Sequence, residues 1–323
     1  MSPTPVRIAG YQGKASIHTA ALQALARALE SRGFGQPVHL QPDVTADGES
    51  AASLFASLES GGREIAYMAS GYLSHRVPEL GVLDLPFCVQ DRGAAMDALD
   101  GEVGRMLRAA VMRATGLHVL GFWDNGFRHV SNALRPIRKP SDCAGLVIRT
   151  LDNADYRALL GALGFQPVTT DVKELVAAVE SGRVQAQENP LTNLLSFGLW
   201  RHHPHVSLTG HLFGVLLLAC PARWWQSLCE GDRRALSQAA DAATAQQRRD
   251  AAAQDVLALA ELRARGVQVL AAHEIDVPAL RDAAEPLAAR QRARLPEPLL
   301  RAWLGAQGLA LPSHDFLPQT IHP

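Results

Sequence analysis

The sequence predicts an α/β protein of two lobes, and three observations support this. Strand and helix patterns alternate within residues 6–68, which favours a mostly parallel sheet. The same order starts again near residue 147, and residues 232–265 form an alanine-rich segment typical of one long helix. A chain of 323 residues has room for about two domains. We therefore expect two lobes joined by hinge strands and by a long helix that spans both.

The first lobe is predicted to alternate strands and helices up to residue 123. Apolar residues recur at helical spacing from Ile17 to Leu29, and Gly33 ends this helix, which follows a loop of residues 11–14. Met96 to Ala110 is expected to form a single helix. The expected strands are residues 6–9, 38–40, 64–68 and 117–123, and the remaining helix is residues 50–60.

The second lobe is predicted to contain two further strands and two helices. Its strands are expected at residues 147–148 and 184–187, and its helices at residues 154–163 and 173–179. Asp232 is expected to cap the long helix, which at about 1.5 Å per residue measures about 50 Å. Residues 267–270 add a strand, and residues 276–307 are expected to be helical, with breaks at Pro286, Pro296 and Pro298.

These patterns divide the chain into two lobes and a tail. The first lobe is expected to comprise residues 1–122 together with about 212–250, and the second lobe residues 123–211 together with about 251–285. Residues 286–323 are expected to form a C-terminal helical tail.

Composition excludes several classes of function. The chain has 31 Lys and Arg against 32 Asp and Glu and no basic block, which argues against a nucleic-acid groove or a polybasic membrane patch. The most apolar stretch, Phe213 to Cys220, is far shorter than the ~20 residues of a membrane span, so no direct membrane insertion is expected. Residues 1–8 lack an apolar segment after their charges, so the sequence predicts no secretory signal.

No enzyme motif with the required spacing is present. The sequence contains no Gly-x-Ser-x-Gly elbow, phosphate-binding Gly-rich loop, His-Glu-x-x-His helix or Gly-x-Gly-x-x-Gly turn. Asp124, Glu188 and His211 are the candidates for a base or nucleophile beside a bound ligand, but they form no recognisable triad order. We therefore expect no enzyme activity and no cofactor.

Histidines and cysteines do not form a recognisable metal or redox motif. Pro204 interrupts the histidine-rich segment, and no Cys or carboxylate stands at ligand spacing, so no metal site is expected. The cysteines lack a Cys-x-x-Cys pair and are predicted to be buried thiols, although Cys220 and Cys229 remain able to pair in a periplasmic protein. The residues considered were His202, His203, His205, His211, Cys88, Cys143, Cys220 and Cys229.

Polar side chains gather at three predicted strand ends in the second lobe. The cluster Trp123–His129 follows a buried strand, Arg149 ends a short apolar strand, and Gln187–Pro190 closes another. Open α/β sheets bind ligands at such strand ends. Arg149 presents a planar fork of donors that suits a carboxylate, and an amide such as Asn189 holds a second oxygen without adding charge.

Each of these residues also has a structural interpretation. Arg149 is equally well explained as one partner of a salt bridge between the lobes, and Arg128 as a solvated loop arginine. Trp123 and Phe127 are by default aromatic residues of the core.

Several ordered sequence blocks resemble the substrate-binding proteins of TRAP transporters, the DctP-like family, over residues ~6 to ~230. The resemblance implies a type II-like periplasmic-binding-protein fold, a periplasmic location, and an interlobe cleft that binds a small organic acid for delivery to a membrane permease. A ligand-sensing module of the same fold, acting with a signalling partner, is the alternative. The blocks are Pro78–Phe87, Gly121–His129, Arg135–Pro140, Gly145–Thr150, Gln187–Leu191 and Ser207–His211.

The resemblance also implies roles for individual residues. Arg149 resembles the arginine that pairs with the ligand carboxylate, and Arg128 and Asn189 resemble its supporting contacts. Gln12 stands where the first lobe often contributes a polar side chain, and Trp123 and Asn125 are expected near the pocket.

Two positions depart from the family pattern. Val172 replaces an aromatic residue that often lines the pocket, and Val184-Gln-Ala186 replaces a segment that usually contains glycine. The ligand itself therefore does not follow from the resemblance.

Overall fold

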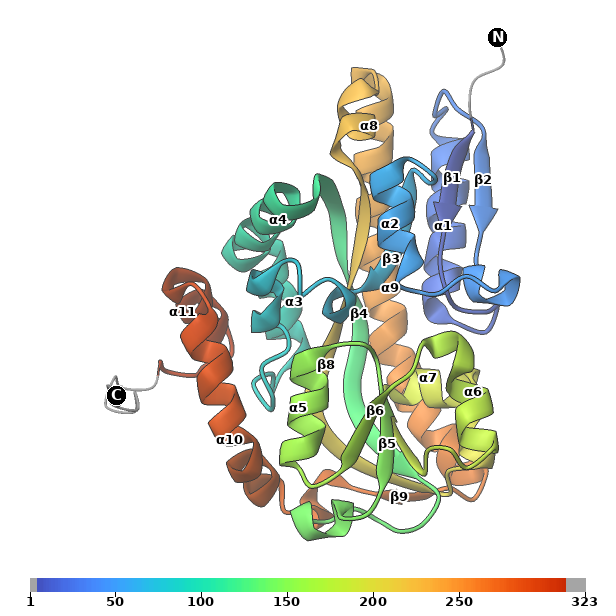
Figure 1. Ribbon diagram of the computed structural model, residues 1–323. Coiled ribbons are helices and arrows are strands. Elements are labelled where there is room, and N and C mark those ends of the chain that lie inside the picture. Colours follow the sequence, from blue (N-terminus) through green and yellow to red (C-terminus); the bar gives the residue numbers. More distant parts are fainter. Residues whose placement is uncertain (1–4, 312–323) are drawn as a thin grey trace.

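The computed structural model describes residues 5–311, and its nine strands form one sheet (Figure 1). Residues 1–4 and 312–323, the ends of the predicted first lobe and tail, lie outside this range. The strand order is β2-β1-β3-β8-β4-β7-β5-β6, and β9 pairs with β8. The strands are β1 (Val6–Ala9), β2 (Val38–Gln41), β3 (Ile65–Ala69), β4 (Leu117–Asn132), β5 (Val147–Thr150), β6 (Gln166–Thr169), β7 (Ala186–Asn189), β8 (His205–Pro221) and β9 (Gln268–Leu270).

Eleven helices of the described range surround this sheet. No helix within residues 5–311 is long and apolar enough to cross a bilayer. The helices are α1 (Ile17–Ser31), α2 (Ser53–Ser60), α3 (Arg92–Asp100), α4 (Glu102–Thr115), α5 (Ala154–Ala162), α6 (Val172–Glu180), α7 (Leu191–Ser196), α8 (Ala222–Ser227), α9 (Glu230–Ala264), α10 (Val277–Arg294) and α11 (Glu297–Ala306).

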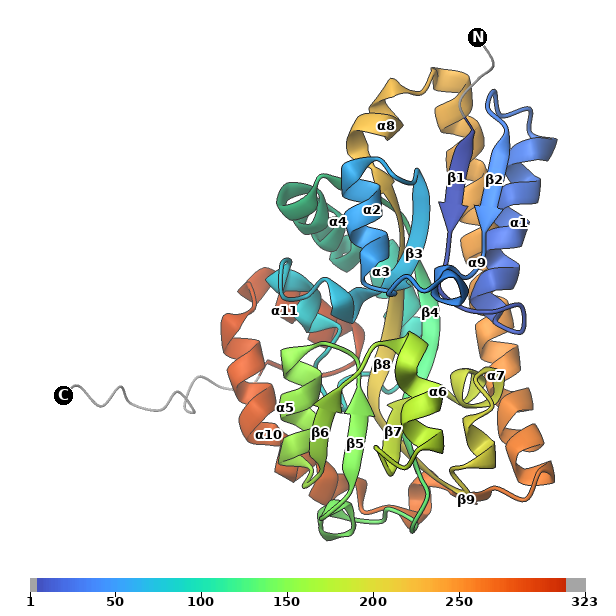
Figure 2. The same ribbon diagram turned by 45° about the vertical axis from the view of Figure 1, so that its right-hand side comes forward.

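The elements form two groups at opposite ends of the molecule (Figures 1 and 2). One group holds β1–β3 with α1 and α2, and the other holds β5–β7 with α5–α7. Strands within each group are parallel, whereas β8 pairs antiparallel with β3 and β4, and β4 pairs antiparallel with β7. The predicted two-lobed α/β fold is confirmed, but the sheet is mixed instead of mostly parallel.

Three long elements run through both lobes. β4 has 16 residues and β8 has 17, and α9 continues for 35 residues along the same direction (Figure 1). At about 3.3 Å per strand residue and 1.5 Å per helix residue, each measures about 50 Å. β8 pairs with β3 in one lobe and β4 pairs with β7 in the other, so these strands connect the two groups.

The segment Trp123–His129 lies inside β4, which corrects the prediction of polar residues after a shorter strand. Its Asp-Asn-Gly sequence, normally a turn signal, forms a β-bulge here. Gly126 has φ +93° and donates its N–H to Asp124 Oδ1 at 2.7 Å, which stabilises the irregular backbone. The strand therefore bends at this point without ending.

Other boundaries also differ from the prediction. Gly101 divides the expected single helix of residues 96–110 into α3 and α4, and Cys229 instead of Asp232 stands at the N-cap of α9. Pro286 lies inside α10, so the expected start of the tail at residue 286 falls within a continuous helix. β6 and the full length of β8 were not predicted, because β6 is short and mostly exposed and β8 is apolar over only part of its length.

A compact apolar cluster fixes the short helix α7. Leu191 and Leu194 are buried against Leu175 of α6 and Leu262 of α9. Each buried leucine contributes about 2 kcal/mol through the hydrophobic effect. Asn193, on the same helix turn, is thereby held in a defined position.

Candidate functional site

A small cavity lies where strand ends of the second lobe face loops of the first lobe. Its volume of about 20 Å³ is room for one or two water molecules, so the lobes are closed on each other. The first lobe contributes Tyr11, Gln12, Ala69 and Tyr72, and β4 contributes Asn125 and Arg128. The second lobe contributes Arg149, Leu151, Val172, Asn189, Asn193 and Phe197.

The cavity brings together five of the six residues predicted to contact a ligand. Trp123 is not among the lining residues. Its side chain is fully buried, packs 5.3 Å from the ring of Tyr67 and donates Nε1–H to Thr244 of α9 at 3.0 Å. Trp123 therefore has the structural role that was its alternative interpretation. The five lining residues are Arg149, Arg128, Asn189, Gln12 and Asn125.

Arg149 carries a buried positive charge that forms no salt bridge with a carboxylate of the described residues. Its side chain is 2% exposed, and Nε donates to the backbone oxygen of Thr170 at 2.8 Å. Nη2 is buried and has no hydrogen-bond partner within residues 5–311. Burial lowers the pKa of Arg149 because it disfavours the charged form. The salt bridge that was its alternative interpretation is absent from the described part of the chain.

Arg128 is buried and paired, which excludes the solvated loop arginine of the alternative interpretation. Its Nε donates to Glu188 Oε2, and its Nη2 donates to Glu188 Oε1 at 2.8 Å. Burial lowers the pKa of Arg128, but the charge and hydrogen bonds of Glu188 more than offset this and hold it above its usual value. Arg128 is therefore a fixed donor at the cavity wall.

Glu188 is fully buried and remains ionised. Burial raises its pKa, but Arg128 and the neighbouring His211 outweigh this effect and lower the pKa of Glu188 to about 2. Thr150 Oγ1 also donates to Glu188 Oε1 at 2.8 Å. One carboxylate thus balances one of the two buried arginines, and the cavity keeps a net positive charge.

Three amides form a chain along one side of the cavity. Asn189 Nδ2 donates to Gln187 Oε1 at 2.6 Å, and Asn189 Oδ1 accepts from Asn193 Nδ2 at 3.2 Å. Asn189 Oδ1 also accepts a long bond from Arg128 Nη2 at 3.4 Å. Asn189 is therefore oriented by its neighbours before any ligand arrives.

In the first lobe, a buried histidine orients Asn125. Gln247 of α9 donates to His18 Nδ1 at 3.2 Å, so His18 carries its proton on Nε2 and donates it to Asn125 Oδ1 at 3.0 Å. Burial lowers the pKa of His18 to about 4, which keeps the ring neutral. With Oδ1 occupied, Asn125 presents its Nδ2 donor.

Gln12 and two tyrosines complete the wall on the first lobe. Gln12 Oε1 accepts from Ser16 Oγ at 2.6 Å, which leaves the Gln12 amide N–H groups as donors. The rings of Tyr11 and Tyr72 meet edge to face with centroids 6.4 Å apart. Burial raises the pKa of both phenols, so both remain neutral hydroxyls.

Sequence reasoning missed several lining residues and one supporting pair. Tyr11 adjoins Gln12 in the predicted loop, and Asn193 follows Asn189 by four residues, so spacing offers a signal for these two. Tyr72 and Phe197 reach the cavity only through the packing of distant segments. Glu188 was considered only as a catalytic group, but it is the partner of Arg128.

Neither a metal-binding cluster nor a disulfide is formed by the histidines and cysteines of residues 5–311. Within residues 5–311, no group of three His, Cys, Asp or Glu side chains is arranged to hold a metal ion. Cys88, Cys143 and Cys220 are buried and free, whereas Cys229 is free and exposed, contrary to the expectation that all four are buried.

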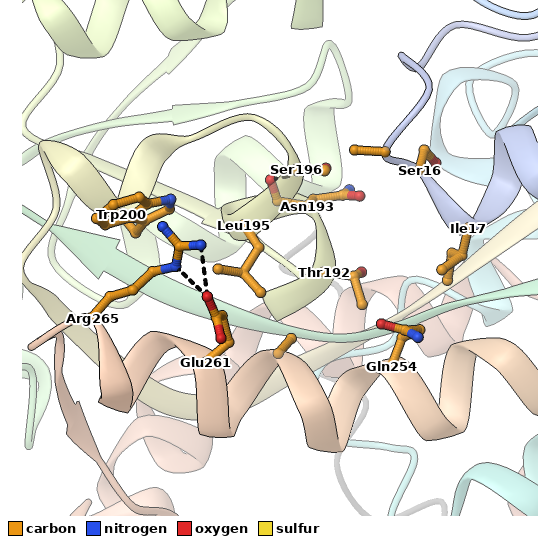
Figure 3. A pocket seen from close by; sticks show the side chains of 12 residues that line it. Ser16, Ile17, Thr192, Asn193, Leu195, Ser196, Trp200, Gln254, Glu261 and Arg265 are labelled. Carbon is orange, nitrogen blue, oxygen red and sulfur yellow. Dashed lines mark hydrogen bonds and ion pairs between the residues drawn. The ribbon is translucent and has the colours of Figure 1, made fainter.

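A second hollow of about 210 Å³ shares Asn193 with the cavity (Figure 3). It lies among α7, α9 and the start of α1, with Ser16 and Ile17 at one end. At the other end Arg265 lies 4.3 Å from the ring centroid of Trp200 and pairs with Glu261 at 2.6 Å. Because Arg265 is already paired, this hollow does not offer the buried free donor that the cavity offers.

The two-lobed fold, with a charged cavity between the lobes, defines a ligand-binding protein of the periplasmic-binding-protein type. The sequence pattern of the family described as bacterial extracellular solute-binding protein, family 7 (DctP), matches residues 10–294. The chain belongs to this family, which confirms the predicted resemblance. The family and the fold are those of binding proteins.

Curated relatives match most of the chain. A protein of Haemophilus influenzae is 32% identical over 231 residues, which is 72% of this chain and 70% of the relative. The 2,3-diketo-L-gulonate-binding periplasmic protein YiaO of Escherichia coli is 28% identical, over 79% of this chain and 76% of its own. A solute-binding protein of Verminephrobacter eiseniae is 31% identical over 66% of this chain and 64% of its own length.

Solved structures match nearly the whole chain. The sugar acid binding protein of Advenella mimigardefordensis in complex with galactonate has a TM-score of 0.89 at 25% identity, covering 95% of this chain and 99% of the other. A TRAP periplasmic solute-binding protein of Polaromonas, bound to D-erythronate, has a TM-score of 0.87 at 28% identity, covering 96% and 100%.

Proposed function

We propose that this protein binds a small hydroxylated carboxylic acid between its lobes, in the periplasm, and delivers it to the permease of a TRAP transporter without chemical change. The observation that carries this proposal is the buried guanidinium of Arg149, whose Nη2 has no partner within residues 5–311. A buried unpaired charge is costly, and a ligand carboxylate removes this cost.

The charge balance supports a ligand with one carboxylate. Glu188 neutralises Arg128, and Arg149 remains as the excess charge. In our proposal the carboxylate accepts from Arg149, whose plane is fixed by the bond from Nε to Thr170. Arg128 and Asn189 then contact the acid from the side.

The polar lining of the first lobe supports a hydroxylated acid. Gln12, Tyr11 and Tyr72 of this lobe, together with Asn125 of β4, offer amide and hydroxyl groups without adding charge. Ligands named for related proteins have this chemistry: galactonate, D-erythronate and 2,3-diketo-L-gulonate all carry one carboxylate and several oxygens. Val172, which is smaller than an aromatic residue, leaves more room on the second lobe.

We further propose that the lobes turn about the bulge of β4. In the register of the sheet, Gly126 pairs with Gly214 of β8, so two glycines face each other where the strands cross between lobes. On this proposal the lobe boundaries expected near residues 122 and 212 coincide with the bend. The lobes must move apart for an acid to enter, because the cavity of about 20 Å³ is smaller than such a ligand.

A thermal-shift panel tests the proposed function. Sugar acids, their amides and neutral sugars are added to the full chain and the melting temperature is recorded. A ligand at 100 times its Kd stabilises the folded state by about 2.7 kcal/mol, which raises the melting temperature by about 5 to 10 °C. At least one acid should give this shift while its amide gives none. Equal shifts from acid and amide would overturn the proposal.

A further inference from the structure

Asn153 of the second lobe forms hydrogen bonds to the first lobe at the edge of the cavity. Its Nδ2 lies 3.0 Å from the backbone oxygen of Gly71, 2.9 Å from Ser74 Oγ and 3.2 Å from Asp84 Oδ2. Asn153 is 6% exposed and Asp84 is 2% exposed, so water competes little for these bonds. One side chain thus links the start of α5 to two loops of the first lobe.

The orientation of this amide is fixed by the helix that it caps. Asn153 Oδ1 accepts from the backbone N–H groups of Asp155 and Tyr156 at 2.8 and 3.0 Å, as the N-cap of α5. The oxygen is therefore on the helix side and the nitrogen on the first-lobe side. The same residue holds its own helix and reaches across the cleft.

These contacts form a thin wall between the cavity and a larger, solvent-accessible pocket. The pocket measures about 410 Å³ and is lined by Gly71, Ser74 and Asn153 among others. Tyr72, which follows Gly71, and Leu151, two residues before Asn153, line the cavity of about 20 Å³. A Cβ atom on Gly71 would lie 3.2 Å from Asn153 Nδ2 and 3.4 Å from Leu151 Cδ1, so the two segments are in close contact.

We propose that Asn153 and Asp84 form a latch that holds the lobes closed and seals the path between the cavity and this pocket. The inference rests on the proposed function, because closure around an acid is what the latch stabilises. Asn153 is a positioning residue in this scheme: it does not line the cavity. Its bonds to the first lobe form on closure and break on opening, so they act chiefly on the release of a bound acid.

The latch gives closure a dependence on pH. Burial raises the pKa of Asp84 to about 7, against only partial compensation by Asn153, Tyr156 and Ser74. Asp84 Oδ1 has no hydrogen-bond partner in the described residues. When the lobes open, water reaches Asp84 and its pKa falls towards the ordinary value. Closure therefore takes up a proton below about pH 7, and closed-state affinity increases as the pH is lowered.

The charged and titratable side chains near Asp84 are either paired with one another, exposed to solvent or neutral, so they do not remove this effect. Burial raises the pKa of Tyr156, so its phenol stays neutral, and the exposed side chains of His75 and Asp152 line the larger pocket. The pairs are Asp155 of α5 with Arg294 of α10 at 2.8 Å, and Glu79 with Arg113 of α4 at 2.6 Å.

The first test uses Asn153→Ser, measured with D-erythronate and galactonate by stopped-flow and calorimetry on the full chain. Serine caps a helix as well as asparagine does but is too short to reach the first lobe. The melting temperature without acid should match that of the wild type. The dissociation rate of the acid should rise about tenfold while the association rate changes less than about threefold.

A matched control separates the latch from interlobe contacts in general. Lys173 also joins the lobes, because its Nζ donates to the backbone oxygen of Gly48 at 3.1 Å, but this contact is exposed. Lys173→Ala should leave the dissociation rate within about twofold of the wild type. An Asn153→Ser protein that releases acid no faster than Lys173→Ala would overturn the latch.

The second test uses Asp84→Asn, which keeps an oxygen for Asn153 but does not titrate. Between pH 8 and pH 6 the wild-type affinity should rise about threefold to tenfold, and the affinity of Asp84→Asn should stay constant. The same slope in both proteins would contradict the role of Asp84. If the wild type bound neither these acids nor any other of the panel, the proposed function would fail and the latch with it; wild-type binding with unchanged variants refutes the latch alone.

Discussion

The carboxylate of Glu188 accepts hydrogen bonds from Nε and Nη2 of Arg128, so the two form a buried ion pair at the cavity wall. Its consequence is a division of roles between two arginines of the same site. Arg128 is neutralised and held in place, whereas Arg149 keeps its charge for a ligand.

Replacing Glu188 with glutamine should destabilise the protein without removing the acid-binding arginine. Glu188→Gln leaves the Arg128 guanidinium buried without a counter-charge, which costs about 3 to 5 kcal/mol. Urea unfolding at neutral pH measures this loss. Glu174→Gln is the control, because Glu174 pairs with Arg183 at 3.4 Å on the surface and contributes less than about 1 kcal/mol. Equal losses of unfolding free energy in the two variants would show that the buried ion pair contributes no more to stability than the surface pair.

Stability should decrease as the pH falls from about 6.5 towards 4. Burial lowers the pKa of His18 and His203 to about 4 and that of His129 to about 3, so the unfolded chain binds protons that the folded chain does not. Each such histidine contributes a slope of about 1.4 kcal/mol per pH unit in this window. Asp84 acts in the opposite sense, because its raised pKa makes the folded chain bind a proton there.

His203→Gln should reduce the dependence of the free energy of unfolding on pH by the contribution of one histidine, about 1.4 kcal/mol per pH unit. His203 lies outside the cavity, and its Nε2 has no partner within residues 5–311. Its Nδ1 contacts Ser131 Oγ at 2.9 Å, and glutamine offers a neutral polar group for this contact. Urea midpoints at pH 7.5, 6 and 5 provide the measurement. An unchanged slope in His203→Gln would mean that this ring is not the neutral buried group proposed.

A side chain at Gly126 should destabilise the bulge of β4 and also hinder the movement of the lobes about it. Gly126→Ala places a Cβ at φ +93° and 3.3 Å from Pro190 Cβ, at the bend between the lobes. Gly145→Ala is the control, since Gly145 has φ +78° but no atom within 4 Å of the new Cβ. Both should lose about 1 to 2 kcal/mol of stability.

Only Gly126→Ala should also change the closure of the lobes. Small-angle scattering should show the radius of gyration of the wild type and Gly145→Ala decreasing with the acid that gives the largest melting shift, and Gly126→Ala decreasing less. A wild-type radius that stays constant on saturation would remove the support for hinge closure.

Several parts of the fold followed from the sequence because local chemistry determines them. Apolar spacing and terminal glycines predicted α1, α5 and α6, and the placement of Arg149 at the end of β5 followed from a short apolar run. The length of β4 did not follow, because the Asp-Asn-Gly turn signal is used in a bulge that only pairing with β8 reveals.

The candidate site was predicted only in part, because some of its residues follow from local sequence patterns and others depend on long-range packing. Asn189 and Arg149 stand at strand ends, where the sequence pattern is informative. Trp123 was expected near the pocket, but it precedes the bulge of β4, and its side chain packs on Tyr67 and donates to Thr244 of α9. The contribution of Tyr72 and Phe197 depends on segments more than 120 residues apart in the chain meeting at one cavity, which no local pattern encodes.

The most direct test of the account is calorimetric titration of Arg149→Ala and Arg149→Lys with the acid that gives the largest melting shift. Truncation of a buried arginine that binds a carboxylate costs about 2 to 5 kcal/mol, so Arg149→Ala should bind at least about thirtyfold more weakly. Arg149→Lys should fail nearly as badly, because an ammonium lacks the fork of donors. Arg157→Ala, on the exposed face of α5, should bind like the wild type. A loss of less than tenfold in Arg149→Ala would contradict the account.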